Sequence, residues 1–195
     1  MKVSCLALAM AFSTAAFAAP ITYTTSLSGP NESPATGSPG VGTGMVIIDT
    51  TANTLFVSET FSGLTSATTA SHIHCCTTAP LSGTAGVATQ TPTFSGFPLG
   101  VTSGSFSQTF DLTQASTYNP AFVTSSGSVA AAEAALAAGM AAGETYLNIH
   151  TTANPGGEIR GFLQTGAAAA PEPGTIGLGA LALLGFLGLR KRLQS

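Results

Sequence analysis

Short segments of alternating hydrophobic and polar residues fill the chain between residues 20 and 165, and glycine or proline separates most of them. Successive side chains of an extended strand point to opposite faces, so this pattern indicates strands with one buried and one polar face. Strands are expected at 21–28, 44–49, 54–61, 65–74, 86–94, 104–111, 145–151 and 158–164. Many short strands with turn residues between them are typical of an all-β sandwich or barrel.

An alanine-rich segment departs from this pattern. Residues 129–142 are mostly alanine, with Leu136 and Met140 four positions apart and Gly143 directly after the segment. Alanine favours helix, the spacing puts both large residues on one face, and glycine commonly follows the last turn of a helix. We therefore expect one short helix that crosses one end of the β-domain.

The segment 145–163 predicts a β-hairpin with one polar face. Tyr146, Asn148 and His150 alternate with the apolar residues Leu147 and Ile149. Four residues with strong turn preference follow, namely Asn154, Pro155, Gly156 and Gly157.

The register of this hairpin follows from its apolar residues. Pairing that keeps Leu147 and Ile149 on the face of Ile159 sets His150 opposite either Glu158 or Arg160. A histidine, a carboxylate and a guanidinium would then be neighbours. We expect a mutually satisfied structural cluster, with a ligand-binding surface as the alternative. Its members are Tyr146, Asn148, His150, Glu158 and Arg160.

Both ends of the chain have the composition of targeting segments. Residues 1–18 combine a basic start, an apolar run and a small-residue end, as in a secretory signal peptide. The linker 166–173 contains Pro171, Glu172 and Pro173, and residues 174–195 form an apolar helix followed by Arg190, Lys191 and Arg192. This C-terminal order resembles the PEP-CTERM sorting signal of Gram-negative bacteria that make exopolysaccharide. The resemblance implies processing by a transpeptidase-like exosortase.

The C-terminal segment also implies a route. A basic cluster prefers the cytoplasmic side, so the apolar run would anchor the domain briefly on the periplasmic side of the inner membrane. Release to the cell surface or the extracellular matrix would follow, with exopolysaccharide or a surface protein as candidate partners.

The charge of residues 19–165 narrows the class of partner. This region has the size of one domain and contains seven acidic residues and one basic residue, Arg160, for a net charge of −6. A nucleic-acid partner requires a basic surface, so none is expected. Adhesion to an acidic polysaccharide would need hydroxyl, amide or bridging-cation contacts rather than a cationic patch.

Three histidines form the strongest chemical signal. His72 and His74 flank Ile73 in an expected strand, so both imidazoles share one face, and His150 lies on the polar face of the hairpin. If the two strands are neighbours, three imidazole nitrogens could bind zinc or copper. Alternatively, the three side chains are polar residues that hydrogen-bond to nearby loops.

Cys75 and Cys76 directly follow the second histidine. Adjacent cysteines cannot close a long loop, and in an oxidising compartment we expect a vicinal disulfide between them. Free thiols are one alternative. Another is a copper(I) or zinc site formed by His72, His74 and Cys75, which would require the chain to turn after His74.

Catalytic patterns are absent from the sequence. The carboxylates are scattered, no serine lies in a Gly-x-Ser-x-Gly motif, and no calcium-binding or phosphate-binding loop occurs. We therefore expect a protein that is not an enzyme and has no obligatory cofactor.

The His-Ile-His motif and the later Tyr-Leu-Asn-Ile-His-Thr…Asn-Pro-Gly-Gly-Glu-Ile-Arg-Gly motif together resemble the CHRD domain, named for chordin. The resemblance covers about residues 21–163, within a domain expected at 19–165, and implies an immunoglobulin-like β-sandwich or barrel. It also implies a secreted module of unsettled role, which in chordin accompanies modules that bind a growth factor. Cys75 and Cys76 depart from the family pattern, where a small or glycine-containing turn is expected.

Three functional interpretations follow. The first is a non-catalytic surface or matrix module that is structural or binds a partner. The second is a zinc or copper protein that uses His72, His74 and His150, with Glu158 or Asn148 orienting an imidazole. The third, an activity like that of copper-zinc superoxide dismutase, rests on analogy of fold alone.

Overall fold

The computed structural model describes residues 19–166, and those up to Gln164 belong to one compact unit. The expected signal peptide at 1–18 and the apolar helix at 174–195 lie outside the described residues, as do Pro171, Glu172, Pro173, Arg190, Lys191 and Arg192. The strands are β1 (Ile21–Ser28), β2 (Val41–Asp49), β3 (Thr54–Ser62), β4 (Thr68–His74), β5 (Gly104–Asp111), β6 (Tyr146–Thr151), β7 (Ile159–Phe162) and β8 (Gln164–Thr165). The helices are α1 (Pro120–Ser126) and α2 (Val129–Ala142), with short 3-10 turns at Gly29–Asn31 and Ala115–Thr117.

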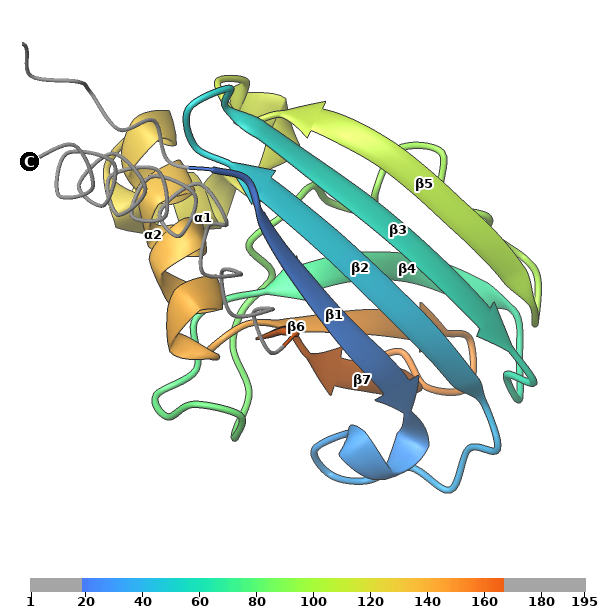
Figure 1. The fold of residues 1–195 in the computed structure, drawn as a ribbon. Coiled ribbons are helices and arrows are strands. Elements are labelled where there is room, and N and C mark those ends of the chain that lie inside the picture. The colour runs from blue at the N-terminus through green and yellow to red at the C-terminus, as the bar shows by residue number, and fades with distance from the viewer. Residues whose placement is uncertain (1–18, 167–195) are drawn as a thin grey trace, which may run out of the picture. The chain divides into compact units, whose positions relative to one another are not determined.

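The strands form one antiparallel sheet in the order β4-β6-β7-β1-β2-β3-β5, and β8 pairs with β1. The sheet curls so that β4 and β6 face β2 and β3 across the core (Figure 1). Two contacts establish this closure: the hydroxyl of Ser71 on β4 donates to the carboxyl of Glu59 on β3, and Leu147 on β6 lies directly against Gly44 on β2. The expected all-β sandwich or barrel class is therefore confirmed.

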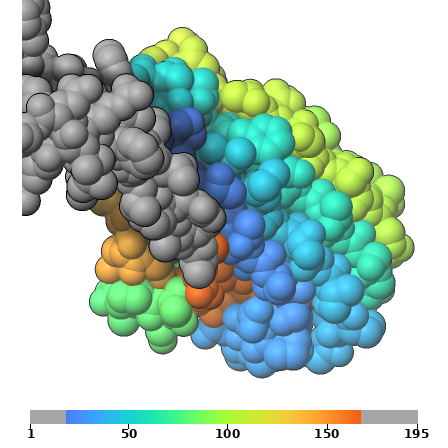
Figure 2. All heavy atoms as spheres, viewed as in Figure 1, coloured from blue at the N-terminus to red at the C-terminus, as the bar shows by residue number. Residues whose placement is uncertain are grey.

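The core lies inside the curl and explains the alternating pattern. Tyr23, Val46 and Val57 are almost fully buried, whereas their neighbours along β1, β2 and β3 are more exposed. Ile73 and Leu147 complete the core from β4 and β6, where the neighbouring side chains are buried as well. Figure 2 shows the outward face of β1, β2, β3 and β5 as a continuous surface. Burial of one face fixes the register, because a shift by one residue would expose every core side chain.

The expected strand at 86–94 is wrong. This segment makes only isolated bridges, between His74 and Val87 and between Thr89 and Tyr118. It runs along the free edge of β4, where Thr89 Oγ1 accepts from the backbone N–H of Ile73 and Thr93 Oγ1 accepts from that of Ser71. Threonine hydroxyls thus supplement a few irregular backbone bonds, such as those from Ala88 N to Ile73 O and from Phe94 N to Ser71 O. The segment covers a sheet edge that would otherwise be open.

Two helices lie at one end of the sheet, where one was expected (Figure 1). The predicted helix is confirmed as α2, which is capped by Ser128 and ends at Gly143 with φ of 72°. The additional helix α1 begins at Pro120 after Asn119, whose side chain accepts from the backbone N–H of Ala121. Within residues 19–166 no single helix is long and apolar enough to cross a membrane, although α1 and α2, bent by 93°, reach that length and composition only as a pair.

Candidate metal centre

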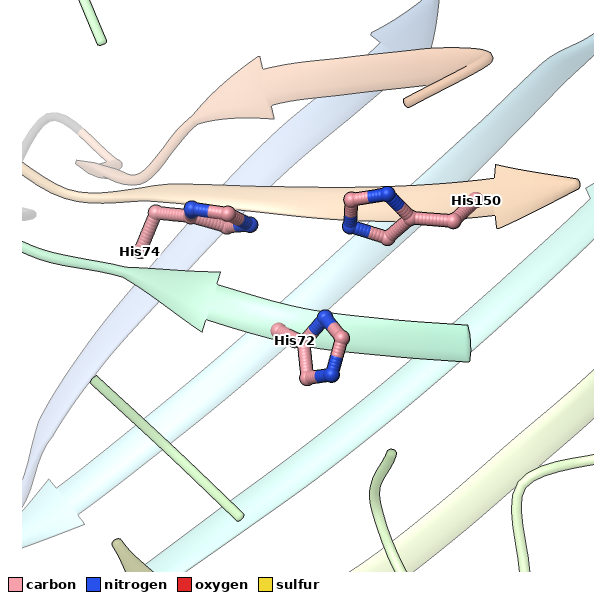
Figure 3. Close-up of side chains that lie close together, drawn as sticks. All are labelled: His72, His74 and His150. Atoms are coloured by element: carbon pink, nitrogen blue, oxygen red, sulfur yellow. The ribbon is translucent and has the colours of Figure 1, made fainter. Parts of the chain in front are cut away.

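The three histidines project from two adjacent strands toward one space (Figure 3). β4 and β6 are hydrogen-bonded neighbours, with His72 opposite Asn148 and His74 opposite Tyr146. Ile73, between the two histidines, points into the core, as expected from strand alternation. The centroids of the three imidazole rings lie 5.1 to 6.0 Å apart.

Loops cover this face of the sheet, so the histidines are buried although they point away from the main core. One nitrogen of each imidazole lies at hydrogen-bond distance from a loop carbonyl oxygen. His72 Nε2 is 2.7 Å from Pro92 O, His74 Nδ1 is 2.9 Å from Ala85 O, and His150 Nδ1 is 3.0 Å from Pro155 O. These loops therefore hold each ring in a fixed orientation.

The carbonyl contacts also assign the tautomers. A carbonyl oxygen can only accept, so the nitrogen that faces it must carry the hydrogen. The lone pairs are then left on His72 Nδ1, His74 Nε2 and His150 Nε2. These three nitrogens are buried and have no hydrogen-bond partner. Each histidine thus presents one unprotonated nitrogen that lacks a partner within the domain.

Burial keeps the three imidazoles neutral. It lowers the pKa of His72 to about 4, and the nearby His150 adds to this effect. Burial likewise lowers the pKa of His74 to about 4, assisted by His150, His72 and Arg160, and it lowers the pKa of His150. Near neutral pH no proton needs to leave before a metal binds.

The spacing fits a single metal ion. One ligand nitrogen from each histidine lies within 4.8 Å of the other two. A metal bound at about 2.0–2.1 Å from each nitrogen requires nitrogens about 3.5 Å apart. Small rotations of the three side chains would close this difference. The hydrogen bonds to backbone carbonyls are the outer contacts that metal-binding histidines usually make.

Tyr146 supports His74. Its ring stacks on the imidazole with centroids 4.7 Å apart, and its hydroxyl both donates to Ala85 O and accepts from Ala85 N at 3.2 Å. The carbonyl of Ala85 therefore receives hydrogen bonds from Tyr146 and His74 together. Because β6 lies between β4 and β7, Arg160 approaches Tyr146 from the other side, with its guanidinium carbon 4.7 Å from the ring centroid.

The prediction that the carboxylate of Glu158 joins His150 and Arg160 in one cluster is wrong. Arg160 lies 3.7 Å from the carboxylate of Glu32, and its Nε donates to Asn31 O. The carboxylate of Glu158 instead accepts from Ser38, Thr65 and Thr151, each at 2.6 Å. The predicted pairing is confirmed, with Asn148 opposite Arg160. However, Glu158 precedes the first residue of β7, so strand alternation does not determine the side to which it points.

The predicted turn completes this side of the centre. Gly157 N donates to Asn154 O, and the carbonyl of Pro155 receives the hydrogen bond from His150. Gly157 has a φ of 128°, and a Cβ placed there would lie 2.5 Å from the amide of Asn148. Gly156 leaves open space beside it. Glycine is therefore required at position 157 by both its conformation and its close neighbours.

The two cysteines form the expected vicinal disulfide and lie apart from the histidines. Cys75 belongs to the hydrophobic core, and both sulfurs lie against α2 beside Gly139. The group of potential ligands consists of His72, His74 and His150, without a cysteine. The alternative site with Cys75 as a ligand is not formed, because Cys75 is bonded to Cys76 and both sulfurs lie beside Gly139 of α2.

Several contributors to the centre were not expected from the sequence. Ala85 and Pro92 act through backbone carbonyls, which carry no side-chain signal. Glu32 lies in a loop between β1 and β2, far in sequence from Arg160. Burial raises its pKa to about 7, although the positive charge of Arg160 opposes this effect.

The protein is an all-β domain with a curled sheet, and loops cover its cluster of three histidines. Sequence comparison identifies the family. The model of the CHRD domain matches residues 23–163, and the chain belongs to this family. The PEP-CTERM protein-sorting motif matches residues 169–192. The chain is therefore an exported protein that carries an exosortase sorting signal and is destined for the cell surface or the extracellular space. Searches of curated proteins and of solved structures found no significant match.

Proposed function

We propose that this CHRD-domain protein is a non-catalytic surface or matrix module that binds one transition-metal ion, zinc or copper, through His72, His74 and His150. The observation that carries the proposal is the convergence of three buried, unpartnered imidazole nitrogens. A purely structural cluster would use both nitrogens of each ring, because an unsatisfied buried polar atom costs about 1–3 kcal/mol. Three such atoms that face one another are explained together by one shared ion.

Binding is favoured over catalysis by the way the site is covered. The carbonyls of Ala85, Pro92 and Pro155 hold the rings beneath loops, and all three ligand nitrogens are buried. A catalytic metal keeps an open position for water or substrate. This closure supports stable retention of an ion and argues against an activity of the superoxide dismutase kind.

Metal titration of the purified full-length protein tests the proposal. We expect one zinc ion per chain, and at least about a 100-fold loss of affinity when any one histidine is replaced by alanine. Asp111→Asn is the matched control, because it removes an exposed carboxylate on β5 and should leave binding unchanged. If neither zinc nor copper binds stoichiometrically, or if the histidine variants bind as well as the wild type, the proposal is wrong.

We also propose that the C-terminal segment anchors the protein briefly in the inner membrane, with the domain on the periplasmic side, before exosortase processing. The matched sorting motif and the basic end of the segment support this route. Replacing Glu172 with alanine should cause the uncut chain to accumulate in the membrane fraction. Normal release of this variant would contradict the proposed processing step.

A further inference from the structure

The charge around the three histidines bears on the kind of ion that they hold. The fixed charge nearest in the described contacts is that of Arg160, whose guanidinium carbon lies 4.7 Å from the centre of the Tyr146 ring that stacks on His74. Glu32 Oε2 lies 3.7 Å from Arg160 Nε while Glu32 Oε1 is buried without a hydrogen-bond partner, and the carboxylate of Glu158 accepts from Ser38, Thr65 and Thr151. The ligands themselves are neutral. Among the described residues, the group of side chains that could share one ion contains no carboxylate and no thiolate.

The loops that cover the three histidines also disfavour a divalent ion. A zinc ion held by three histidines ordinarily takes a fourth ligand, a water or hydroxide. In this domain the three ligand nitrogens are shielded from solvent by loops fixed through Pro92, Ala85 and Pro155. Asn148, opposite His72 on the neighbouring strand, adds a side-chain amide to the same face, and this amide is buried and neutral. A divalent ion would remain without the anionic fourth ligand that offsets its charge.

The electrostatic cost of burial then distinguishes the candidate ions. The solvation lost when an ion enters a medium of low dielectric constant scales with the square of its charge, so a divalent ion loses roughly four times as much as a monovalent one. Copper(I) is monovalent, has a filled d shell and accepts three ligands in a trigonal arrangement without a fourth.

We infer that the site formed by His72, His74 and His150 selects copper(I) over zinc(II) and copper(II), as a three-coordinate centre closed to water. This inference rests on the proposed metal-binding function and specifies its ion. Three features together favour the ion of lower charge: the neutral ligands, the absence of a carboxylate or thiolate from the ligand group of the described residues, and the loops that cover the histidines. Asn148 is a specificity-determining residue in this account, because it keeps the face neutral beside His72.

Competition titrations of the metal-free full-length protein test the inference. Copper(I) is added without oxygen in the presence of a chromogenic copper(I) chelator, and zinc(II) and copper(II) are titrated separately against their own chelators. We expect one copper(I) per chain with a Kd about 100-fold or more below those of the other two ions, a difference of about 2.7 kcal/mol. X-ray absorption of the copper(I) form should show three nitrogen ligands and no fourth light atom.

The variant Asn148→Asp tests the electrostatic reason directly. It keeps the side-chain shape and all three ligands but adds a carboxylate to the face. We expect it to reduce the preference for copper(I) over zinc(II) by about 10-fold or more, since opposite charges attract strongly at low dielectric constant. Asp111→Asn, an exposed change at the end of β5 outside the ligand group, should leave the preference unchanged.

The outcomes separate this inference from the proposed function. Binding of zinc(II) or copper(II) at the histidines as tightly as copper(I) would overturn the selectivity and leave the metal site intact. A fourth ligand from water in the copper(I) form would also overturn it. Failure of all three ions to bind would remove both proposals.

Discussion

The ring of Tyr146 lies parallel to the imidazole of His74, with 4.7 Å between centroids and 8° between planes. Both side chains also bond to the carbonyl of Ala85, through the tyrosine hydroxyl and through His74 Nδ1. One residue of β6 therefore determines both the plane of a candidate metal ligand and the carbonyl that selects its tautomer. The hairpin that carries the family motif and the metal centre form one structural unit.

Replacing Tyr146 with phenylalanine should weaken metal binding. The ring stacking is kept, but the hydroxyl that fixes the loop at Ala85 is lost, so His74 Nδ1 faces a less ordered acceptor. We expect about a 10-fold loss of affinity, the lower end of the effect of outer contacts on metal sites. Tyr118→Phe is the matched control, because its hydroxyl also donates to a backbone carbonyl, that of Leu112. Equal affinity of Tyr146→Phe and wild type in a chelator competition would contradict this role.

Replacing Arg160 with alanine should destabilise the metal-free domain more than it affects binding. The side chains of Arg160 and Glu32 are each 5 % exposed, so the change leaves a buried carboxyl without its cation. It also removes the bond from Arg160 Nε to Asn31 O. We expect a loss of about 3 kcal/mol in the free energy of unfolding. Urea unfolding measures it, and the double variant with Glu32→Gln should recover part of the loss. A wild-type midpoint for Arg160→Ala would refute the assignment.

The buried carboxyl of Glu59 should make the domain less stable as the pH rises from 4.5 to about 8. It bonds only to the hydroxyl of Ser71 among the described residues, and burial raises its pKa to about 8. The unfolded chain releases this proton near pH 4.5 and the folded one near pH 8. The stability gained by holding the proton is therefore complete below pH 4.5 and is lost as the pH rises to about 8.

The variant Glu59→Gln should remove this dependence. Wild type should lose on the order of 4 kcal/mol between pH 4.5 and 8 relative to the variant, because a pKa difference of one corresponds to about 1.4 kcal/mol. Denaturant unfolding at several pH values measures the difference. Asp111→Asn serves as the control, since hydrogen bonds from Thr113 lower the pKa of Asp111, which therefore titrates below this range. Parallel pH profiles for wild type and Glu59→Gln would exclude a buried, protonated Glu59.

Gly139 should tolerate no side chain. Alanine normally stabilises a helix by about 1 kcal/mol relative to glycine, but a Cβ at this position of α2 would lie 2.5 Å from Cys76 Sγ and 2.6 Å from Cys75 Sγ. We expect Gly139→Ala to lower stability by about 2 kcal/mol. Ala138→Gly gives the ordinary cost of glycine in the same helix. Thermal unfolding decides the sign, and stabilisation by Gly139→Ala would show that the disulfide does not pack there.

The limits of the sequence prediction follow from the kind of contact involved. The bounds of β1, β5 and α2 agree with the prediction because alternation, helix propensity and capping are local properties. The segment 86–94 alternates like a strand, but Thr89 and Thr93 bond to β4 through hydroxyls. The helix α1 has only seven residues, too few for a periodic signal.

The candidate site likewise has some features that the sequence predicts and others that it does not. The common face of His72, His74 and His150 follows from alternation once β4 and β6 are neighbours. The partner of Arg160 could not be predicted, because Glu32 approaches from a loop 128 positions away in sequence. The carbonyls that orient the rings belong to ordinary loop residues and have no sequence signature.

Nuclear magnetic resonance of the imidazole nitrogens tests the central claim most directly, because the chain contains three histidines and all belong to the site. In the metal-free full-length protein, we predict a hydrogen on His72 Nε2, His74 Nδ1 and His150 Nδ1. One equivalent of a diamagnetic ion, zinc(II) or copper(I), should shift His72 Nδ1, His74 Nε2 and His150 Nε2 together, at a ratio of one ion per chain. If any of these three nitrogens keeps its metal-free resonance at saturation, the three-histidine centre is contradicted.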